Sequence, residues 1–260
     1  MIKCGLLGNH ISYSKSPILH QTIGRFLNVQ ISYEIFDVTE SEIPKVISMI
    51  RSGKLRGLNI TIPYKQKIMA HCDELTPAAR KIQAVNCLYL KDHKVIGDNT
   101  DYDGFLGTLI KEEIDVKHKR VCILGSGGAA KACYVVLTDL GAKVCVASRR
   151  KDTIDPLFKC VIGYEDIKPN QIDLYVQATP VGTYPNVLES IVPKAFVEEH
   201  TVIDLIYNPP VTQILKDAKR GINGISMMII QALRSEEIWL DRKININDAQ
   251  FLKLKEVIEA

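Results

Sequence analysis

The stretch that decides the fold is Arg120–Ala130, RVCILGSGGAA. Its first half, RVCIL, has the apolar pattern of a buried strand, and it leads directly into Gly125-x-Gly127-x-x-Ala130 and the helical pattern KACYVVLTDL. In such a strand–turn–helix unit, Gly125 allows the tight turn, Gly127 lets the backbone approach a pyrophosphate, and Ala130 lets helix and strand pack closely. The stretch therefore predicts a dinucleotide-binding unit, the alternative being a turn of small residues without a ligand.

The end of the next strand indicates which dinucleotide binds. That strand is predicted at 142–147, and an NAD-preferring site places an acidic residue after it, about 20 residues past the glycines, to bind the ribose 2′-hydroxyl. This sequence has Ser148-Arg149-Arg150-Lys151 there instead. Because a guanidinium suits a 2′-phosphate, we predict NADP rather than NAD, the alternative being a solvated basic loop.

Outward from this stretch, β-rich runs alternate with helical patterns along the chain. Before it, strands are predicted at 2–8, 31–38, 57–62, 84–90 and 94–99, with helices at 17–28 and 41–53. The last two strands are expected to pair at the edge of this first domain, joined by the turn-like KDHK. After it, strands are predicted at 173–179 and 201–207. Right-handed crossovers then imply parallel sheets covered by helices.

The predicted fold class is α/β with two domains. Residues 1–101 form an N-terminal α/β domain with a mainly parallel sheet, and residues 102–225 form a Rossmann-like, doubly wound domain, with a cleft between the two. The helical patterns in 226–260 come after the last strand, and we expect them to return to the first domain. A chain of 260 residues is long enough for two domains, at about 150 residues per domain.

Composition and charge exclude several classes of partner. Lys and Arg total 33 against 30 Asp and Glu, and the signs are interspersed, so there is no electrostatic footprint for nucleic acid or an anionic membrane. No apolar run reaches about 18 residues, and the apolar core at the N-terminus is too short for a signal peptide. We therefore expect a soluble, cytoplasmic monomer or homodimer whose partner is a small molecule.

The cysteines and histidines indicate neither a disulfide framework nor a metal. Seven cysteines are scattered without a C-x-x-C pair, and several lie in apolar, strand-like runs, so we expect reduced thiols. The six histidines are dispersed, and no cluster of His, Cys and Asp has zinc-ligand spacing. We expect no metal.

Polar side chains at the ends of predicted elements concentrate in the first domain. Hydroxyls, an amide and charged groups can bracket a small molecule that carries a carboxylate and several hydroxyls, because together they donate and accept hydrogen bonds. The candidates are Ser14, Ser16, Thr61, Lys65, Asn86, Asn99, Thr100 and Asp101.

Most of these candidates also have a structural alternative. Ser16 precedes a proline and can cap a helix, and Asp101 can cap the helix that follows it. Thr61 can be a plain strand-end residue, and Lys65 can be an exposed lysine at the start of the helical pattern KQKIMAHC. In the second domain, Thr179 ends a strand at the edge where open α/β sheets bind ligands, or it only terminates that strand.

In combination, these motifs carry a family resemblance. The motifs are S-x-S-P at 14–17, N-I-T-I-P-x-K at 59–65, A-V-N at 84–86, G-D-N-T-D at 97–101, G-S-G-G-A at 125–129 and the segment 224–231. In order and spacing they resemble the shikimate dehydrogenase family over nearly the whole chain. The resemblance implies reversible, NADP-linked reduction of 3-dehydroshikimate to shikimate, a step towards the aromatic amino acids.

The resemblance also implies roles for single residues. Lys65 is the implied catalytic acid/base and Asp101 its partner. The implied substrate contacts are Ser14, Ser16, Thr61, Asn86, Asp101, Tyr207 and Gln231. The cofactor-binding candidates are Gly125, Ser126, Gly127, Gly128, Ala129, Ser148, Arg149, Arg150, Lys151, Thr179, Leu205 and Gly224. Gly224 is implied to lie near the nicotinamide, or is a turn glycine, and Tyr207 is alternatively a packed aromatic.

The chemistry agrees with the role of Lys65. As a hydride reaches a ketone carbon, negative charge develops on the ketone oxygen, and an adjacent ammonium stabilises that charge and then donates a proton. Asp101 would hold the Lys65 ammonium in place by a charge-assisted hydrogen bond.

Some positions depart from the family pattern. His10 replaces the proline of N-P-I-x-H-S, and Tyr102 replaces the glycine of N-T-D-G. Two alternatives therefore stay open: an enzyme that also accepts quinate or uses NAD, and a ligand-sensing regulator of the same fold without turnover. The presence of both Lys65 and Asp101 favours the enzyme.

Overall fold

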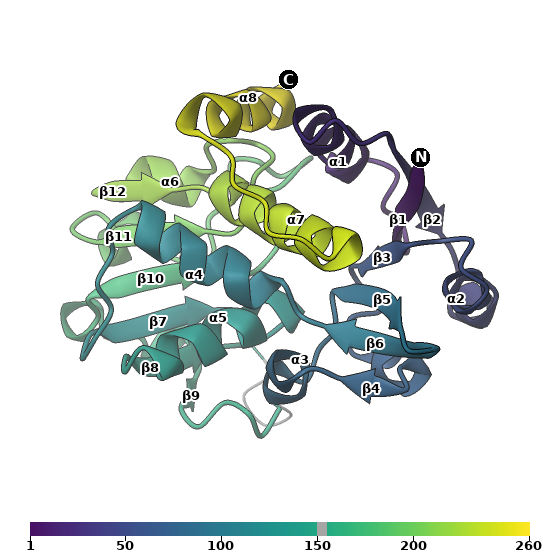
Figure 1. Cartoon of the computed structure of the whole chain (residues 1–260). Helices are drawn as coiled ribbons and strands as arrows, with labels where there is room; N and C mark the ends of the chain where they lie inside the picture. Colours follow the sequence, from purple (N-terminus) through teal and green to yellow (C-terminus); the bar gives the residue numbers. More distant parts are fainter. Residues whose placement is uncertain (150–154) are drawn as a thin grey trace. The chain divides into compact units, whose positions relative to one another are not determined.

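The computed structural model describes residues 1–149 and 155–260, and in these ranges the chain divides into two compact units. Unit 1 comprises Met1–Gly104 and Ile229–Ala260, and unit 2 comprises Phe105–Met228 (Figure 1). The domain boundaries expected from the sequence, after residues 101 and 225, lie a few residues earlier. Within the described ranges, no helix combines the length and the apolar composition that a membrane crossing requires.

Unit 1 is built on a mixed sheet with the strand order β2-β1-β3-β5-β6-β4. The strands are β1 (Ile2–Gly8), β2 (Ile31–Asp37), β3 (Gly57–Ile60), β4 (Glu74–Leu75), β5 (Cys87–Lys91) and β6 (Lys94–Asp98). β1 pairs in parallel with β2 and β3, and β4 pairs in parallel with β6, whereas β5 pairs antiparallel with β3 and β6. The expectation that β5 and β6 form the edge is wrong, because the two-residue strand β4 occupies it.

The helices of unit 1 follow from their apolar spacing and start signals. α1 (Ser16–Phe26) has a proline in its first turn, and α2 (Ile43–Arg51) buries Ile43, Val46, Ile47 and Ile50 on one face. The remaining short elements are η1 (Glu40–Glu42), η2 (Lys67–His71) and α3 (Pro77–Ile82). α4 (Asp101–Lys111) and α7 (Ile225–Leu240) each contribute residues to both units, and α8 (Asp248–Glu259) belongs to unit 1.

The C-terminal segment completes the core of unit 1. Trp239 on α7 is 1% exposed, and its Nε1 donates to the Leu88 carbonyl on β5 at 3.2 Å. Gly57 at the start of β3 leaves room for this ring, since a Cβ there would lie 2.0 Å from Trp239 Nε1. α8 packs against α1 (Figure 1). Unit 1 is therefore closed by the last residues of the chain.

Unit 2 holds a parallel sheet with the strand order β12-β11-β10-β7-β8-β9. The strands are β7 (Arg120–Leu124), β8 (Lys143–Ala147), β9 (Val161–Ile162), β10 (Leu174–Gln177), β11 (Thr201–Asp204) and β12 (Arg220–Ile222). The described pairings are parallel, and the two halves of the sheet run outward from β7 and β10. This is the strand order of a doubly wound dinucleotide fold, which confirms the predicted fold class. The helical elements are α5 (Gly128–Asp139), α6 (Gln213–Asp217), η4 (Tyr164–Asp166), η5 (Pro169–Gln171) and η6 (Lys194–Phe196).

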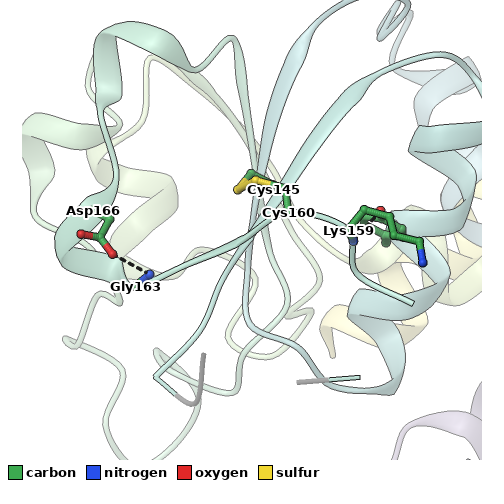
Figure 2. The surroundings of a disulfide bond; sticks show 6 residues. Cys145, Lys159, Cys160, Gly163 and Asp166 are labelled. Carbon is green, nitrogen blue, oxygen red and sulfur yellow. Dashed lines mark hydrogen bonds between the residues drawn. A yellow bond between two sulfur atoms is a disulfide. The ribbon is translucent and has the colours of Figure 1, made fainter. Parts of the chain in front are cut away.

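A disulfide joins two neighbouring strands of unit 2 (Figure 2). Cys145 on β8 and Cys160, directly before β9, are bonded, with their Cα atoms 4.7 Å apart. The Val146 N–H donates to the Cys160 carbonyl at 2.9 Å, so main-chain pairing brings the two side chains together. The expectation of reduced thiols is wrong for this pair, because the sequence does not reveal the register of β8 and β9. The other five cysteines, all in the described ranges, are not disulfide-bonded.

Candidate active site

Lys65 and Asp101 form a largely buried ion pair in unit 1. Lys65 Nζ donates to Asp101 Oδ2 at 2.5 Å, and the two side chains are 16% and 8% exposed. Lys65 lies in the turn after β3, and Asp101 is the first residue of α4. The alternative of an exposed lysine is therefore wrong for Lys65. It does describe Lys67, whose exposed ammonium pairs with the exposed Glu40.

Main-chain hydrogen bonds hold the three segments that carry this pair. The Lys65 carbonyl accepts from the Val85 N–H at 2.7 Å, and the Asn86 carbonyl accepts from the Ile60 N–H at 2.8 Å. The Asn86 N–H in turn donates to the Asp98 carbonyl at the end of β6, at 3.0 Å. The turns after β3 and β6 and the entry to β5 are thus connected by the sheet itself.

Side-chain amides then orient the carboxylate. Asn86 Nδ2 donates to Asp101 Oδ1 at 2.8 Å, so each carboxylate oxygen has a donor. Asn99 Nδ2 donates to the Ala84 carbonyl at 2.9 Å, and its Oδ1 accepts from the Asp101 N–H at 3.1 Å. These contacts are typical of a fixed ligand site, in which surrounding residues lock the reactive groups in one geometry.

The other substrate candidates of unit 1 lie at the ends of neighbouring elements. Ser14 Oγ donates to Ser16 Oγ at 3.1 Å. Ser16 is the first residue of α1, and the N-cap of this helix is Lys15, which makes no side-chain hydrogen bond there. Ser16 is therefore not the cap of α1. Thr61 directly follows β3 and is half-buried.

Gln231 on α7 accepts from Thr100 Oγ1 at 3.4 Å. Thr100 also donates its N–H to Asn86 Oδ1, at 2.7 Å, which links Gln231 to the amide that holds Asp101.

In unit 2, the glycine turn between β7 and α5 leaves the N-terminus of α5 open. Gly125 has φ +107°, and a Cβ there would lie 2.6 Å from Thr179 Cγ2, so only glycine allows the two loops to approach. Gly127 is the N-cap of α5, which has no side-chain cap hydrogen bond, and a Cβ on Gly127 would meet nothing within 4 Å. An open approach to the N–H groups of a helix N-terminus suits an anion. Ser126, Gly128 and Ala129 complete this turn and the first residues of the helix.

The basic segment after β8 is described only in part. Ser148 is buried, and its hydroxyl lies 3.2 Å from that of Ser126, which ties the segment to the glycine turn. Arg149 is exposed. Arg150 and Lys151 lie outside the described residues.

Of the remaining candidates of unit 2, Leu205 and Tyr207 follow β11, and Gly224, which follows β12, contacts the same segment. The Leu205 N–H donates to the Gln177 carbonyl at 3.0 Å, and the Gly224 N–H donates to the Ile206 carbonyl at 3.0 Å. A Cβ on Gly224 would lie 2.1 Å from the Leu205 carbonyl oxygen, so packing within unit 2 already requires glycine there. Tyr207 is half-buried and lies in unit 2, whereas the other substrate candidates lie in unit 1.

Asp204 anchors this segment. Thr212 Oγ1 donates to Asp204 Oδ2 at 2.5 Å, and the Ile206 N–H donates to Oδ1 at 3.0 Å. Burial raises the pKa of Asp204 to about 7, against the opposing effect of these two hydrogen bonds. Sequence reasoning did not single out Asp204, because its side chain acts on the chain that follows it.

Sequence reasoning named only some of the polar residues behind the Lys65–Asp101 pair. Thr100 was among the polar candidates at the domain boundary, whereas Asn59 lies within the motif N-I-T-I-P-x-K without an assigned role. Tyr33 and Ser235 had no such signal, because each lies in an ordinary strand or helix pattern. Among residues 1–149 and 155–260, no three His, Cys, Asp or Glu side chains gather as metal ligands.

Comparison with known proteins places these features in a family context. A family model described as "Shikimate dehydrogenase substrate binding domain" matches residues 6–88. A shikimate dehydrogenase (NADP(+)) of Clostridium beijerinckii is 38% identical over 256 residues, which covers 92% of this chain and 94% of the relative.

Solved structures with similar chains agree. Shikimate dehydrogenase 1 from Peptoclostridium difficile has a TM-score of 0.89 and 35% identity, covering 100% of this chain and 98% of that one. Shikimate 5-dehydrogenase from Thermus thermophilus, solved in complex with NADP(H) and shikimate, has a TM-score of 0.89 and 28% identity, covering 99% of this chain and 100% of that one.

Proposed function

Since this chain belongs to the shikimate dehydrogenase family, its reaction is the reversible, NADP-dependent reduction of 3-dehydroshikimate to shikimate, and we propose that Lys65 and Asp101 form its acid–base pair. The observation that carries this proposal is the 2.5 Å contact between the two largely buried side chains. An ammonium in this position has a fixed direction and limited access to water, and such preorganisation strengthens its effect on a developing charge.

The reduction needs one proton for each hydride. When bound, NADPH supplies the hydride to the ketone carbon, and electron density moves to the ketone oxygen. The Lys65 ammonium stabilises that oxygen and donates its proton to give the alcohol, and a proton from solvent then restores the ammonium. In the reverse direction, Lys65 first loses a proton to solvent, and its neutral amine then accepts the proton of the alcohol while the hydride passes from carbon to NADP⁺.

Asp101 holds the ammonium in one place. Its Oδ2 accepts from Lys65, and its Oδ1 accepts from Asn86, so the carboxylate cannot rotate without breaking a hydrogen bond. Removing one partner of a buried pair leaves an uncompensated charge, which is why neither residue can be replaced without cost.

We assign substrate contacts to the polar residues of unit 1. A ligand with a carboxylate and several hydroxyls needs donors and acceptors on several sides, and hydroxyl and amide groups serve as both. The proposed contacts are Ser14, Ser16, Thr61, Asn86, Asp101 and Gln231, with Tyr207 from unit 2. The 14–16 hydroxyl pair and the Thr100–Gln231 contact support this assignment.

We assign NADP to the glycine turn and its neighbours in unit 2. The turn of Gly125–Ala129 and the N-terminus of α5 would hold the pyrophosphate. The basic segment after β8 would hold the 2′-phosphate, as its sequence predicts: Ser148, Arg149, Arg150 and Lys151. Three further residues would lie along the cofactor: Thr179, Leu205 and Gly224. The open space at Gly127 supports this assignment, because a backbone without a side chain there can approach phosphate oxygens.

Replacing Lys65 by alanine tests the acid–base pair. We expect kcat for shikimate oxidation to fall roughly 10²–10⁴-fold, because the proton-transfer group is lost, while the Kd for shikimate changes much less. Steady-state absorbance of NADPH and shikimate titration measure the two quantities.

The matched control is Lys67→Ala, which removes an exposed lysine two residues further on, at the start of η2. It should leave kcat close to that of the native enzyme. Parallel loss of binding and rate in Lys65→Ala, without a specific fall in kcat, would instead indicate a structural lysine.

The same assay separates the alternatives left open by the sequence. Turnover with quinate or NAD would identify the broader enzyme, and binding of both ligands without any change in NADPH absorbance would identify a sensor. We also propose that the chain acts in the cytoplasm and that it is a monomer or a homodimer. Sedimentation of the purified protein distinguishes these two oligomeric states.

A further inference from the structure

A chain of buried hydrogen bonds begins behind the sheet of unit 1. Tyr33 on β2 donates its hydroxyl to Asn59 Oδ1 at 2.9 Å, and Asn59 Nδ2 donates to Ser235 Oγ at 2.9 Å. All three side chains are buried, and Ser235 is 0% exposed. Because an amide nitrogen can only donate, Ser235 accepts at this contact, and its single proton has two acceptors within reach: the Gln231 carbonyl one turn earlier in α7, at 3.0 Å, and the Thr100 hydroxyl, at 3.3 Å.

The chain continues from Ser235 to Asp101. The hydroxyls of Ser235 and Thr100 lie 3.3 Å apart. The single hydroxyl proton of Thr100 has Asn86 Oδ1 at 3.2 Å as a nearer acceptor than Gln231 Oε1 at 3.4 Å, and the Thr100 N–H donates to the same Asn86 oxygen at 2.7 Å. Asn86 Nδ2 then donates to Asp101 Oδ1 at 2.8 Å. The contacts connect α7 with the carboxylate that holds Lys65.

The direction of these bonds has a chemical consequence. With two donors on Asn86 Oδ1, the amide must present its NH₂ group to Asp101, since the reverse orientation would place an amide oxygen against a carboxylate oxygen. Ser235 holds the Asn86 amide in this orientation through its contact with the Thr100 hydroxyl. Ser235 is itself fixed by Asn59, whose Nδ2 donates to Ser235 Oγ and lies 3.2 Å from the Asn86 carbonyl. Hydrogen-bond networks in a low dielectric reinforce one another, so loss of one member weakens the rest.

Ser235 is not required to hold α7 in place. The neighbouring Glu236 forms a 2.6 Å contact between its Oε1 and His20 Nδ1, and both side chains are buried. Trp239 Nε1 donates to the Leu88 carbonyl, and Arg56 Nε donates to the Trp239 carbonyl at 2.5 Å. The helix therefore keeps its position when the Ser235 hydroxyl is removed.

We propose that Ser235 is a positioning residue of the reaction: acting through Thr100 and Asn86, its hydroxyl holds Asp101, and with it the Lys65 ammonium, in the geometry that donates the proton. This inference rests on the proposed function of Lys65 and Asp101. It gives α7 a second part in the reaction, beside the proposed contact of Gln231 with the substrate.

The variant Ser235→Ala tests this role. We expect kcat for shikimate oxidation to fall roughly threefold to tenfold, the value of one hydrogen bond, with the KM for shikimate changed by less than about twofold. The matched control is Thr22→Val, which removes another buried hydroxyl of unit 1 that bonds a helix carbonyl four residues earlier. It should leave kcat unchanged. Equal kcat values for native enzyme and Ser235→Ala would overturn the proposal.

A double-mutant cycle distinguishes positioning from general loosening. If Ser235 acts through Thr100, then Ser235→Ala combined with Thr100→Val should be about as slow as Thr100→Val alone. Multiplied effects of the two substitutions would mean that they act separately, and the proposed path would be wrong. Should Ser235→Ala aggregate, Ser235→Cys keeps the volume with a much weaker donor and must show the same fall in kcat.

The outcome is separable from that of the proposed function. Lys65→Ala measured in the same assay shows whether the acid–base pair exists. A large fall in kcat for Lys65→Ala with full activity in Ser235→Ala refutes only the role of Ser235, whereas full activity in Lys65→Ala refutes the pair itself.

Discussion

Asp101 and Asp204 are both buried, but they have different partners. Asp101 accepts from the Lys65 ammonium and the Asn86 amide. Asp204 accepts from the Thr212 hydroxyl and the Ile206 N–H, which are both uncharged. Two neutral hydrogen bonds do not offset the loss of water around a carboxylate, so burial raises the pKa of Asp204 to about 7.

The raised pKa of Asp204 predicts how stability depends on pH. An Asp in an unfolded chain titrates near pH ~4, so the folded chain binds the extra proton and the free energy of unfolding should decrease as pH rises from about 4 to about 7. The full cost, reached above about pH 7, is on the order of 4 kcal/mol as an upper bound. Asp204→Asn keeps a polar partner for Thr212 and Ile206 without ionising, so it should remove this fall.

Urea unfolding of both proteins at about pH 5 and about pH 8 measures the effect. The variant should lose less stability than the native chain between the two values, and at the higher pH it should be at least as stable. The same pH dependence in both proteins would show that Asp204 does not titrate in this range.

Single residues were predictable where a motif marked them. Lys65, Asn86 and Asp101 lie in short motifs whose order already indicates a shared site, and the structure joins them by hydrogen bonds. Ser235 was not predictable, because its contact with Asn59 depends on how α7 is rotated about its axis against β3. In the sequence, Ser235 stands between Arg234 and Glu236, where a polar residue would be expected on the exposed face of a helix.

Gly57 on β3 has less room for a side chain than any other described glycine of this chain, because α7 packs directly against it. A Cβ on Gly57 would lie 2.0 Å from Trp239 Nε1 and 2.2 Å from Cε2. Trp239 is 1% exposed and cannot turn away without breaking its hydrogen bond to the Leu88 carbonyl. Gly57 therefore sets how closely the helix approaches the sheet.

Gly57→Ala should destabilise unit 1 by roughly 1–3 kcal/mol or more, because the added methyl overpacks the core. Denaturant unfolding followed by Trp239 fluorescence measures this loss, since the chain has one tryptophan. Adding Trp239→Phe removes the clashing indole ring, so the double variant, followed by circular dichroism, should lose less than the sum of the single losses. Simple additivity would show that the predicted clash does not form.

Strands and helices were predicted where they are long and periodic. β1, β2 and the β5–β6 pair occur close to their expected ranges, and the glycine turn leads from β7 into α5 as predicted. β4 was missed, because two residues carry no periodic signal. The Cys145–Cys160 bond was missed for a related reason: it depends on the pairing of β8 with a two-residue strand, β9.

Unit 1 is made of two segments that are far apart in the sequence. The C-terminal helices contribute Trp239 and Ser235 from α7, and Phe251, Leu254 and Ile258 from the buried face of α8. The sequence led to the expectation that these helices return to the first domain, because helices after the last strand need a surface to pack on. The exact division at residues 104 and 228 required the contacts themselves.

Removing α8 tests the independence of the two units. A chain that ends at Arg242 loses three buried apolar side chains, worth on the order of 5 kcal/mol of burial. The midpoint of the Trp239 fluorescence transition should fall, because this tryptophan reports on unit 1 alone. The part of the circular dichroism transition that belongs to unit 2 should keep its midpoint. An unchanged fluorescence midpoint would show that α8 does not support unit 1.

The two-segment construction of unit 1 also orders events during protein synthesis. When the first 104 residues leave the ribosome, the helix that carries Trp239 has not been translated, so the Trp239 ring does not yet cover Gly57. Unit 2 is continuous in the sequence, so all of its residues are synthesised before the segment that completes unit 1. The nascent N-terminal segment therefore exposes apolar surface until the C-terminal helices that cover it have been synthesised.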